Sequence, residues 1–297
     1  MTEIAILTEK RYLKAKSNDW YVQNIIKEDS LVQYELEKLN ISCKRVAWDK
    51  DFDPSDFKFA LFRTTWNYFD EINKFMSFLD LCKNSISLIN SRDLILWNLD
   101  KRYLLLLRDQ GVNIPETHIV NKESGVSLLE VVNQYNWTDI VIKPCVSAAA
   151  WNTHYIKKCE IKNAEVLFSD LTEYNDMMVQ SFQKNIISKG EISFMIIGGC
   201  FSHAVLKRAK TGDFRVQDDF GGTVTVYIPN DSEIGFALDA ISKLPSRPAY
   251  ARVDVIVDNA GNLALSELEL IEPELWFRLK PDSAKSLAKY IRNHVIR

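Results

Sequence analysis

The sequence predicts an α/β protein with α+β subdomains, and three observations support this class. Strand-like and helix-like segments alternate over about the first 90 residues, a pattern typical of an open sheet with parallel members. Two β-hairpins follow in the second half, one about Gly198-Gly199 and one about residues 259–262. The chain has 297 residues and is 46% hydrophobic, which is ample for a core spread over two or three packed subdomains.

Residues 1–90 form the first predicted domain, in which strands alternate with amphipathic helices. The first helix is expected to start on the polar residues Asp29 and Ser30, after which apolar residues recur at helical spacing. The predicted strands cover residues 2–8, 41–48 and 59–64, and the predicted helices cover residues 29–39 and 71–83.

Residues 91–176 form the second predicted domain. Asp100 is expected to cap a helix over residues 101–110, which Gly111 then stops. A short apolar strand and a second helix are expected further along the chain. They cover residues 139–144 and residues 167–174.

Residues 177–297 form the third predicted domain, in which two hairpins flank a polar loop. Residues 209–222 of this loop combine glycines with charged side chains, which is typical of a functional segment. The predicted strands cover residues 177–182, 191–197, 200–207, 250–258 and 263–269, and a helix covers residues 232–243.

Composition excludes several classes of protein. The formal net charge of −3 gives no bulk attraction for nucleic acid or for an anionic membrane surface. No apolar run approaches membrane-spanning length, and residues 1–11 lack the apolar core of a signal peptide. The five cysteines are scattered without a Cys-x-x-Cys pair, so we expect reduced thiols in a cytoplasmic protein. The four histidines show no metal-ligand spacing, so zinc is not expected.

The last hairpin brings charged residues together. Arg252 and Asp254 share a face of one arm, and Glu267 and Glu269 share a face of the other. Folding the arms about the turn places three carboxylates side by side, where they repel one another unless a cation lies among them. Mg²⁺ prefers such oxygen ligands, and the guanidinium of Arg252 suits a phosphoryl oxygen. The alternative is a solvated hairpin face, which leaves Arg252 and Asp254 unexplained.

Lysines at the ends of elements are the candidates for a phosphate site. The sequence contains neither G-x-x-x-x-G-K-[ST] nor G-x-G-x-x-G, which excludes glycine-rich phosphate loops of those types. Lys101 stands at the expected helix start, where backbone N–H groups and the helix dipole also favour an anion. Lys143 ends an apolar strand and points toward whatever lies over the following loop. Taken alone, Lys101 is more simply a residue of a solvated helix face.

Together these features resemble the ATP-grasp superfamily, in which R-x-D on one strand is followed by E-x-N on the next. Asp254 and Glu267 stand at the spacing of the D-alanine–D-alanine ligase branch. Glu269 replaces the usual asparagine, which keeps an oxygen ligand and adds a negative charge. The resemblance implies an ATP-grasp fold behind an N-terminal open α/β domain. It also implies that Asp254, Glu267 and Glu269 bind two Mg²⁺ ions, or Mn²⁺, together with ATP.

The resemblance assigns roles to further segments. Residues 144–151 take the place of a glycine-rich lid, and their alanines should make the loop stiffer. Residues 178–182 resemble the strand that holds adenine through main-chain groups and one side chain. Arg252 and Arg215 are implied as catalytic residues on the transferring phosphate, with Arg208 left open. The implied nucleotide-binding residues are Lys101, Lys143, Gln180, Ser181, Phe182, Glu191 and Lys207.

Within the superfamily the chain is most similar to the branch of glutathione synthetase, cycloserine synthetase and small L-amino-acid ligases. Residues 63–68, 97–101 and 267–273 carry this similarity. It implies a carboxylate–amine ligase that forms an amide, such as a dipeptide of L-amino acids, through an acyl phosphate. An arginine-accepting ligase of the rhizocticin-dipeptide type needs carboxylates to pair a guanidinium. The candidates for these carboxylates are Asp218, Asp219, Glu272 and Glu274, and Arg215 is a further candidate for contact with the substrate.

Three alternatives stay open. The first is the cyclisation of an amino-acid derivative, the second a nucleotide-binding module without turnover, and the third a kinase that stops after phosphotransfer. An intact carboxylate set argues against the second, because loss of metal ligands is an easy route to an inactive protein. The expected partners are small amino acids rather than nucleic acid or membrane, and homodimerisation is left open.

Overall fold

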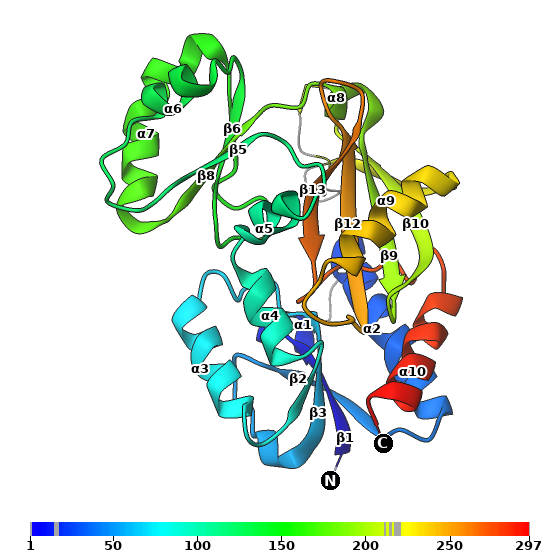
Figure 1. Ribbon diagram of the computed structural model, residues 1–297. Helices are drawn as coiled ribbons and strands as arrows, with labels where there is room; N and C mark the ends of the chain where they lie inside the picture. The colour runs from blue at the N-terminus through cyan, green and yellow to red at the C-terminus, as the bar shows by residue number, and fades with distance from the viewer. Residues whose placement is uncertain (1, 15–17, 211, 214–215, 217–220, 297) are drawn as a thin grey trace.

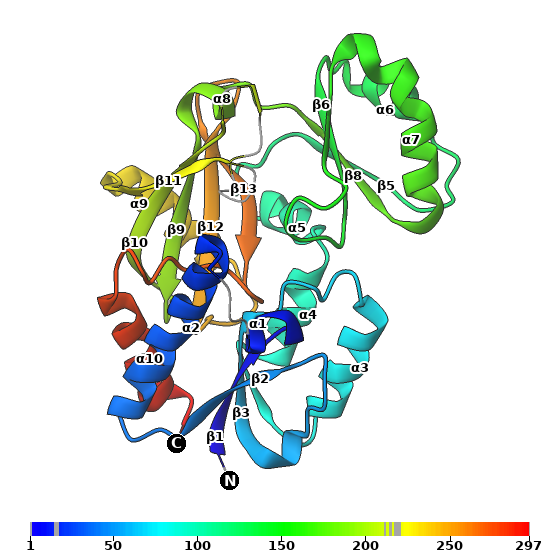
Figure 2. The ribbon, with the colours of Figure 1, turned by 180° about the vertical axis from the view of Figure 1, so that it is seen from behind.

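Three β-sheets organise the computed structural model, which describes residues 2–14, 18–210, 212–213, 216 and 221–296 (Figures 1 and 2). The first sheet lies at the end of the molecule where both termini are found. The second sheet and its helices form a separate lobe, and the third sheet stands beside that lobe. None of the helices within the described ranges is long and apolar enough to span a bilayer.

The first sheet is parallel, with strand order β2-β1-β3-β4, as the alternation of strands and helices predicts. Helix α2 begins at Trp20, well before the predicted start at residue 29. Asp29 and Ser30 had suggested a polar helix start, yet both lie inside the helix, and Asp29 is buried 2.9 Å from Arg45. The elements are β1 (Thr2–Thr8), α1 (Lys10–Leu13), α2 (Trp20–Lys38), β2 (Cys43–Ala47), β3 (Phe57–Thr64), α3 (Ile72–Cys82) and β4 (Ser87–Ile89).

The second sheet is antiparallel, with strand order β5-β8-β6-β7. Helices α6 and α7 cover one of its faces, and α7 begins at Ile161 rather than at the predicted residue 167 (Figure 1). Strand β8 pairs with both β5 and β6, so we place the end of the second domain after β8 and not at residue 176. The elements are β5 (Thr117–Val120), α6 (Leu128–Tyr135), β6 (Ile140–Pro144), β7 (His154–Ile156), α7 (Ile161–Tyr174) and β8 (Met177–Ser181).

The third sheet is antiparallel, with strand order β11-β10-β9-β12-β13, and it contains both predicted hairpins. One apolar cluster joins it to the first sheet through α2 and α10, which lie side by side in Figure 2. The elements are α8 (Asn185–Lys189), β9 (Glu191–Ile197), β10 (Cys200–Arg208), β11 (Thr223–Tyr227), α9 (Asp231–Ser242), β12 (Tyr250–Val257), β13 (Leu263–Glu269) and α10 (Asp282–His294).

Helices α4 (Arg92–Leu99) and α5 (Tyr103–Asp109) cover the outer edge of β13. The hydroxyl of Tyr103 accepts the Leu268 N–H at 2.9 Å, and the Asn98 amide bonds the main chain of Leu268 and Leu270. These side chains satisfy backbone groups that an edge strand otherwise leaves to solvent. The predicted carboxylate strand is therefore held by polar contacts on its outer side.

The prediction that Asp100 caps a helix starting at residue 101 is wrong. Asp100 directly follows α4, and α5 begins only at Tyr103. The Asp100 side chain accepts the Arg102 N–H at 2.8 Å, so it stabilises the turn between the two helices. The sequence favoured a cap because an acidic residue before an apolar run is the usual signal for one.

Candidate active site

A cavity of about 250 Å³ lies among the three sheets and contains the residues that the sequence singled out. They come from segments far apart in the chain, including α4–α5, β6, β8 and the third sheet. Arg215, Asp218 and Asp219 lie outside the described residues. The predicted residues that line the cavity are Lys101, Lys143, Gln180, Ser181, Phe182, Glu191, Lys207, Arg252, Asp254, Glu267, Glu269, Glu272 and Glu274.

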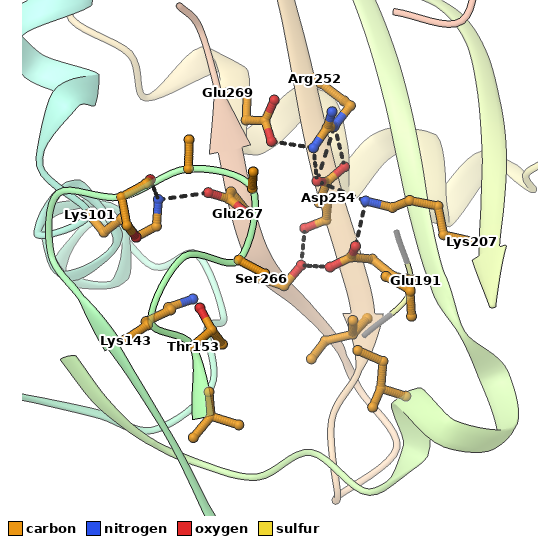
Figure 3. A pocket seen from close by; sticks show the side chains of 18 of the residues that line it. Lys101, Lys143, Thr153, Glu191, Lys207, Arg252, Asp254, Ser266, Glu267 and Glu269 are labelled. Atoms are coloured by element: carbon orange, nitrogen blue, oxygen red, sulfur yellow. Dashed lines mark hydrogen bonds and ion pairs between the residues drawn. The ribbon is translucent and has the colours of Figure 1, made fainter. Parts of the chain in front are cut away.

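One face of the third sheet forms the polar wall of this cavity (Figure 3). Strand pairing sets its contacts, because Glu191 stands opposite Lys207 and Asp254 stands opposite Glu267. The pairing shifts at Ser266, so that Ser266 also reaches the cavity and donates to Glu191 at 2.6 Å. Such a bulge re-aims side chains beside a site.

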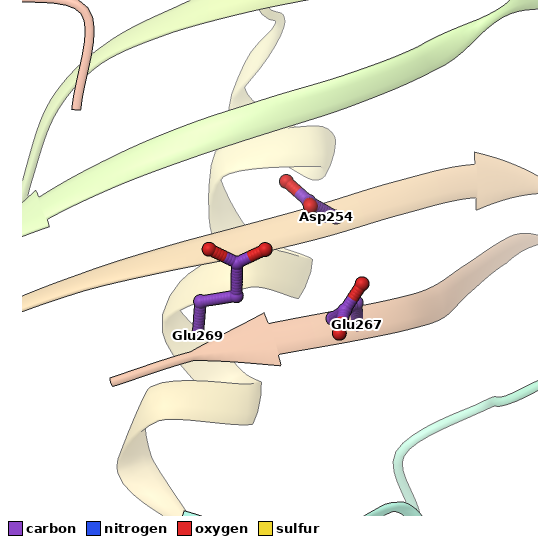
Figure 4. A group of neighbouring side chains, drawn as sticks. All are labelled: Asp254, Glu267 and Glu269. Carbon is purple, nitrogen blue, oxygen red and sulfur yellow. The ribbon is translucent and has the colours of Figure 1, made fainter. Parts of the chain in front are cut away.

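Three carboxylates of the hairpin form a compact cluster (Figure 4). One oxygen from each of Asp254, Glu267 and Glu269 lies within 4.8 Å of the others. Asp254 is buried, while the two glutamates are half-buried. The predicted juxtaposition of the two arms is therefore present, and its oxygen-only ligand set suits Mg²⁺.

Basic side chains pair with this cluster. Arg252 donates from Nη2 to Asp254 Oδ2 at 2.8 Å and also contacts Glu269. Lys207 lies 2.6 Å from Glu191 Oε2 and 3.2 Å from Asp254 Oδ2. Burial raises the pKa of Asp254, but the charges of Arg252 and Lys207 outweigh it and lower that pKa to about 2. Asp254 is accordingly ionised at any physiological pH.

The pKa values of the two glutamates of the cluster shift in opposite directions. Burial raises the pKa of Glu269 to about 7, and the nearby carboxylates of Glu267 and Asp254 add to the rise against the opposing charge of Arg252. Burial also acts to raise the pKa of Glu267, but Lys101 and Lys143 reverse the effect and lower it. The cluster is thus crowded with negative charge at Glu269, where a proton or a metal cation relieves the repulsion.

Lys101 connects the carboxylates to the loop after β6. Its Nζ lies 2.9 Å from Glu267 Oε1 and donates to the Ser147 carbonyl at 2.7 Å (Figure 3). Its backbone N–H donates to the Cys145 carbonyl at 2.8 Å. Lys101 lies in the turn before α5, so the helix-dipole argument for it is wrong, although its ammonium does line the cavity.

Lys143 presents a different electrostatic situation. Burial lowers the pKa of its ammonium, and the attraction of Glu267 and Glu191 offsets this only in part. No hydrogen bond or ion pair joins its side chain to any residue in the described ranges. A half-buried cation that has no partner among the described residues and lines a cavity favours an anionic ligand.

The loop after β6 presents free backbone N–H groups to the cavity. Ala149 and Ala150 have φ values of +49° and +55°, in the left-handed region that favours glycine. Their amides, and that of Ala148, make no hydrogen bond within the described ranges, and all three residues line the cavity. Backbone N–H groups left free beside a cavity can donate to an anionic ligand. Trp151 at the loop end packs on Phe69, with ring centroids 5.6 Å apart.

The far end of the cavity is apolar and bounded by β8. The Gln180 side chain lies there and donates to Thr117 Oγ1 at 2.8 Å. Both main-chain polar groups of Phe182 are already bonded, to Asp139 and to Asn259, so Phe182 offers its ring instead. The main-chain groups of Ser181 are bonded as well, its N–H to the Glu116 carbonyl and its carbonyl to Gln183 Nε2, so the adenine-binding role of this segment stays a prediction.

The turn after β13 carries the two carboxylates expected at a substrate site. Glu272 is buried and makes no side-chain hydrogen bond or ion pair within the described part of the chain. Burial raises its pKa well above the usual value, and Glu269 adds to the effect. Glu274 instead pairs with Arg278. The structure therefore separates two residues that the sequence treated alike.

Several cavity residues were not anticipated. Val141 is two residues from Lys143, and Ile256 is two residues from Asp254, on the same strand in each case. Residues two apart share a face of a strand, so this spacing could have predicted that both line the cavity. The bulge residue Ser266 had no such signal. Aromatic residues from distant segments also line the cavity without a local sequence signal; they are Tyr21, Trp66 and Trp276.

Comparisons with known proteins agree with this arrangement. Residues 105–268 match the ATP-grasp domain of prokaryotic glutathione synthetase, and residues 4–90 match the N-terminal domain of D-cycloserine synthetase DcsG. The cycloserine biosynthesis protein DcsG of Streptomyces lavendulae is 23% identical over 287 residues, covering 87% of this chain and 93% of the relative.

Two solved structures show the same architecture. That of D-cycloserine synthetase DcsG has a TM-score of 0.84 at 22% identity and covers 97% of this chain and 98% of its own. The structure of D-alanine–D-alanine ligase of Bacillus anthracis complexed with ATP has a TM-score of 0.66 at 14% identity, and the match covers 98% of this chain and 96% of the ligase chain. These likenesses confirm the predicted fold, an ATP-grasp fold behind an open α/β domain.

Proposed function

The chain belongs to the ATP-grasp family of prokaryotic glutathione synthetase, and we propose that it joins a carboxylate to an amine at the expense of ATP. The observation that carries this proposal is the alternation of carboxylates and cations along one cavity wall. Asp254, Glu267 and Glu269 supply oxygen ligands, and Arg252 and Lys207 stand among them. Phosphate binding together with a hard cation requires both kinds of group in one place.

The donor set fits magnesium on the geometry of this chain. Three oxygens crowd within 4.8 Å, and the carboxylates of Glu267 and Asp254 add to the rise that burial causes in the pKa of Glu269, so a cation bound among the three is favoured. When bound, magnesium neutralises phosphate oxygens and holds them in place. We assign the metal to Asp254, Glu267 and Glu269.

The nucleotide has a proposed place along the remainder of the cavity. The unpaired ammonium of Lys143 and the free amides of Ala149 and Ala150 suit the phosphates, with Lys101 and Lys207 beside them. Glu191 is proposed for the ribose, because a carboxylate that already bonds Lys207 and Ser266 still has lone pairs free. Gln180, Ser181 and the Phe182 ring are proposed for adenine.

The proposed chemistry proceeds in two steps. A carboxylate oxygen of the substrate attacks the γ-phosphorus of ATP, the bond to the β–γ bridging oxygen breaks, and an acyl phosphate and ADP result. An amine then attacks the acyl carbon and loses a proton, and phosphate leaves with the former carboxylate oxygen. Arg252, and Arg215 outside the described residues, are proposed to stabilise charge on the transferring group.

We propose small amino acids as substrates, with Glu272 accepting from a substrate cation. Its carboxyl is buried, unpartnered within the described ranges and part of the cavity lining. An arriving ammonium or guanidinium would convert it to a carboxylate in an ion pair. Glu274 is a weaker candidate because it already forms an ion pair with Arg278. Arginine is accordingly the first amino acid to test.

A second candidate function is the cyclisation of an amino-acid derivative. The specific observation in its favour is the match of residues 4–90 to the N-terminal domain of D-cycloserine synthetase DcsG. The first step is the same for both candidates. They differ in whether the attacking nitrogen belongs to the same molecule as the activated carboxylate.

The test is ADP release from MgATP with amino acids supplied singly and in pairs, followed by the mass of the product. A ligase gives release that depends on two amino acids and a product heavier than either. Cyclisation gives release with a single compound and a product lighter than it. Equal release with and without amino acids contradicts both, and release with phosphorylation of a single substrate indicates a kinase.

A further inference from the structure

Trp276 combines three features that together single it out within the described part of the cavity lining. Its φ is +45°, in the left-handed region where a bulky residue is an outlier. Its side chain is only 3% exposed, and its indole Nε1 is buried without a hydrogen-bond partner among the described residues. It lines the same cavity as the carboxylate cluster. A buried indole N–H almost always donates to an acceptor, and no acceptor for Trp276 is found among the described residues.

The surroundings of Trp276 hold its unusual conformation in place. Glu272 and Pro273 accept at their carbonyls from Trp66 and Arg63, and the Leu275 carbonyl accepts from His203 Nε2 at 3.0 Å. After Trp276, the N–H groups of Phe277 and Arg278 donate to Glu28 at 2.8 and 2.9 Å. Strained residues persist only where neighbours over-determine them, and they gather at functional sites.

The electrostatic environment indicates which kind of acceptor belongs there. The guanidinium of Arg252 lies 5.3 Å from the Trp276 ring centroid and the ammonium of Lys207 lies 5.9 Å from it. Both side chains belong to the polar wall in Figure 3. Two cations beside the ring favour an anionic oxygen near the indole N–H and disfavour a cationic ligand there.

We propose that the Trp276 indole N–H binds the carboxylate of the amino acid that is to be activated. Glu272, on the same turn, then receives its ammonium, so that one short segment recognises both charges of an α-amino acid. This inference rests on the proposed ligase function and names a residue that fixes the orientation of its acyl substrate. It makes Trp276 a substrate-binding residue.

The closing experiment reads the indole directly. Protein labelled with ¹⁵N-tryptophan gives an indole N–H resonance for each of its seven tryptophans, and Trp276→Phe assigns one of them. If the phenylalanine variant does not fold, Trp276→Tyr serves for the assignment. The probes are MgAMPPNP alone and MgAMPPNP with each of the standard L-amino acids, D-alanine and D-serine.

The proposal expects a downfield shift of the Trp276 resonance with at least one amino acid and none with MgAMPPNP alone. A shift produced by the nucleotide alone overturns it, as does the absence of any shift across the whole panel. The shift of the indole resonance does not depend on turnover. If an amino acid shifts the resonance but no ADP is released, the ligase function is contradicted while the binding role of Trp276 is supported.

Steady-state kinetics of the Trp276→Phe variant provide a second, independent test of the proposal. The ring and its packing stay while the N–H is lost, so KM for the activated amino acid should rise roughly 10- to 100-fold while KM for ATP stays unchanged. Trp20→Phe is the control, because Trp20 is exposed and not part of the cavity lining. An equal rise in both KM values, or in neither, overturns the proposal.

Discussion

The ammonium of Lys101 lies 2.9 Å from Oε1 of Glu267. A lysine that is expected to bind phosphate is therefore paired with a carboxylate that is expected to bind metal. Lys207 stands in the same relation to Asp254, at 3.2 Å. Two lysines of the cavity are thereby paired with two of its carboxylates. Binding of MgATP brings both a cation for the carboxylates and anions for the lysines, so each ion pair can be exchanged without leaving a buried charge alone.

Lys143 is predicted to be the lysine with the largest effect on nucleotide affinity. Lys143→Met should weaken MgAMPPNP binding roughly 10- to 100-fold, the scale of one hydrogen bond to a charged group. The free protein should keep its stability, because burial lowers the pKa of this ammonium and its loss removes no ion pair. Calorimetric titration and thermal unfolding test both parts, with the exposed Lys162→Met as control. Unchanged affinity in the folded variant contradicts the assignment.

Glu267 and Glu269 are predicted to differ in how strongly their substitution lowers activity. Glu267→Gln should lower ADP release about 100-fold or more, because it removes the charge that Lys101 and the metal share. Glu269→Asn should keep measurable activity, since it retains an oxygen ligand and removes the most crowded carboxylate. Steady-state ADP release at saturating MgCl₂ is the measurement. Comparable activity of the two variants would refute the distinction.

The alanine loop is predicted to accept glycine. Replacing both Ala149 and Ala150 by Gly relieves a left-handed strain of roughly 1 kcal/mol each and adds chain entropy of similar size, so the free energy of unfolding should change little. The loop amides should exchange with solvent faster, and KM for ATP should rise. Ala150→Val is the contrast, with a cost of roughly 1–3 kcal/mol because a branched residue is disfavoured there. Slower amide exchange in the glycine variant would be incompatible with this account.

His203 is predicted to make stability depend on pH. Burial lowers the pKa of its imidazole to about 4, from about 6.5 in the unfolded chain. Between these values the unfolded state binds more protons, so stability is present above pH 6.5 and falls as the pH drops toward 4, by roughly 2–3 kcal/mol.

Urea unfolding at pH values across this window tests the prediction for His203. His203→Gln should have a flatter profile than the wild type, and the exposed His294→Gln should not. Profiles of equal slope for all three proteins would exclude His203 as the cause.

Local patterns sufficed for the two hairpins and for three strands of the parallel sheet, whereas its fourth strand, β4, was not predicted. The alternation of Arg252 with Asp254, and of Glu267 with Glu269, placed all four side chains on one wall because strand geometry has a fixed period. Helix starts were less predictable. Asp29 and Ser30 looked like a polar helix start, whereas Asp29 is buried inside α2, where it pairs with Arg45.

The parts of the site that the sequence did not predict depend on contacts between distant segments. The bulge at Ser266 arises from strand pairing and leaves no local signal. Trp276 reaches the cavity only because the turn around it is bonded to Arg63, Trp66, His203 and Glu28. Glu272 and Glu274 look equivalent in sequence, and only the partner Arg278 distinguishes them.

The central claim is that a substrate carboxylate is activated by phosphorylation, and isotope transfer tests it most directly. An amino acid that supports ADP release is labelled with ¹⁸O in its carboxylate, and the phosphate that is released is examined by mass. The account predicts that the phosphate carries one ¹⁸O, because a carboxylate oxygen bridges to phosphorus in the acyl phosphate and leaves with it. Amide formation with unlabelled phosphate would contradict the account.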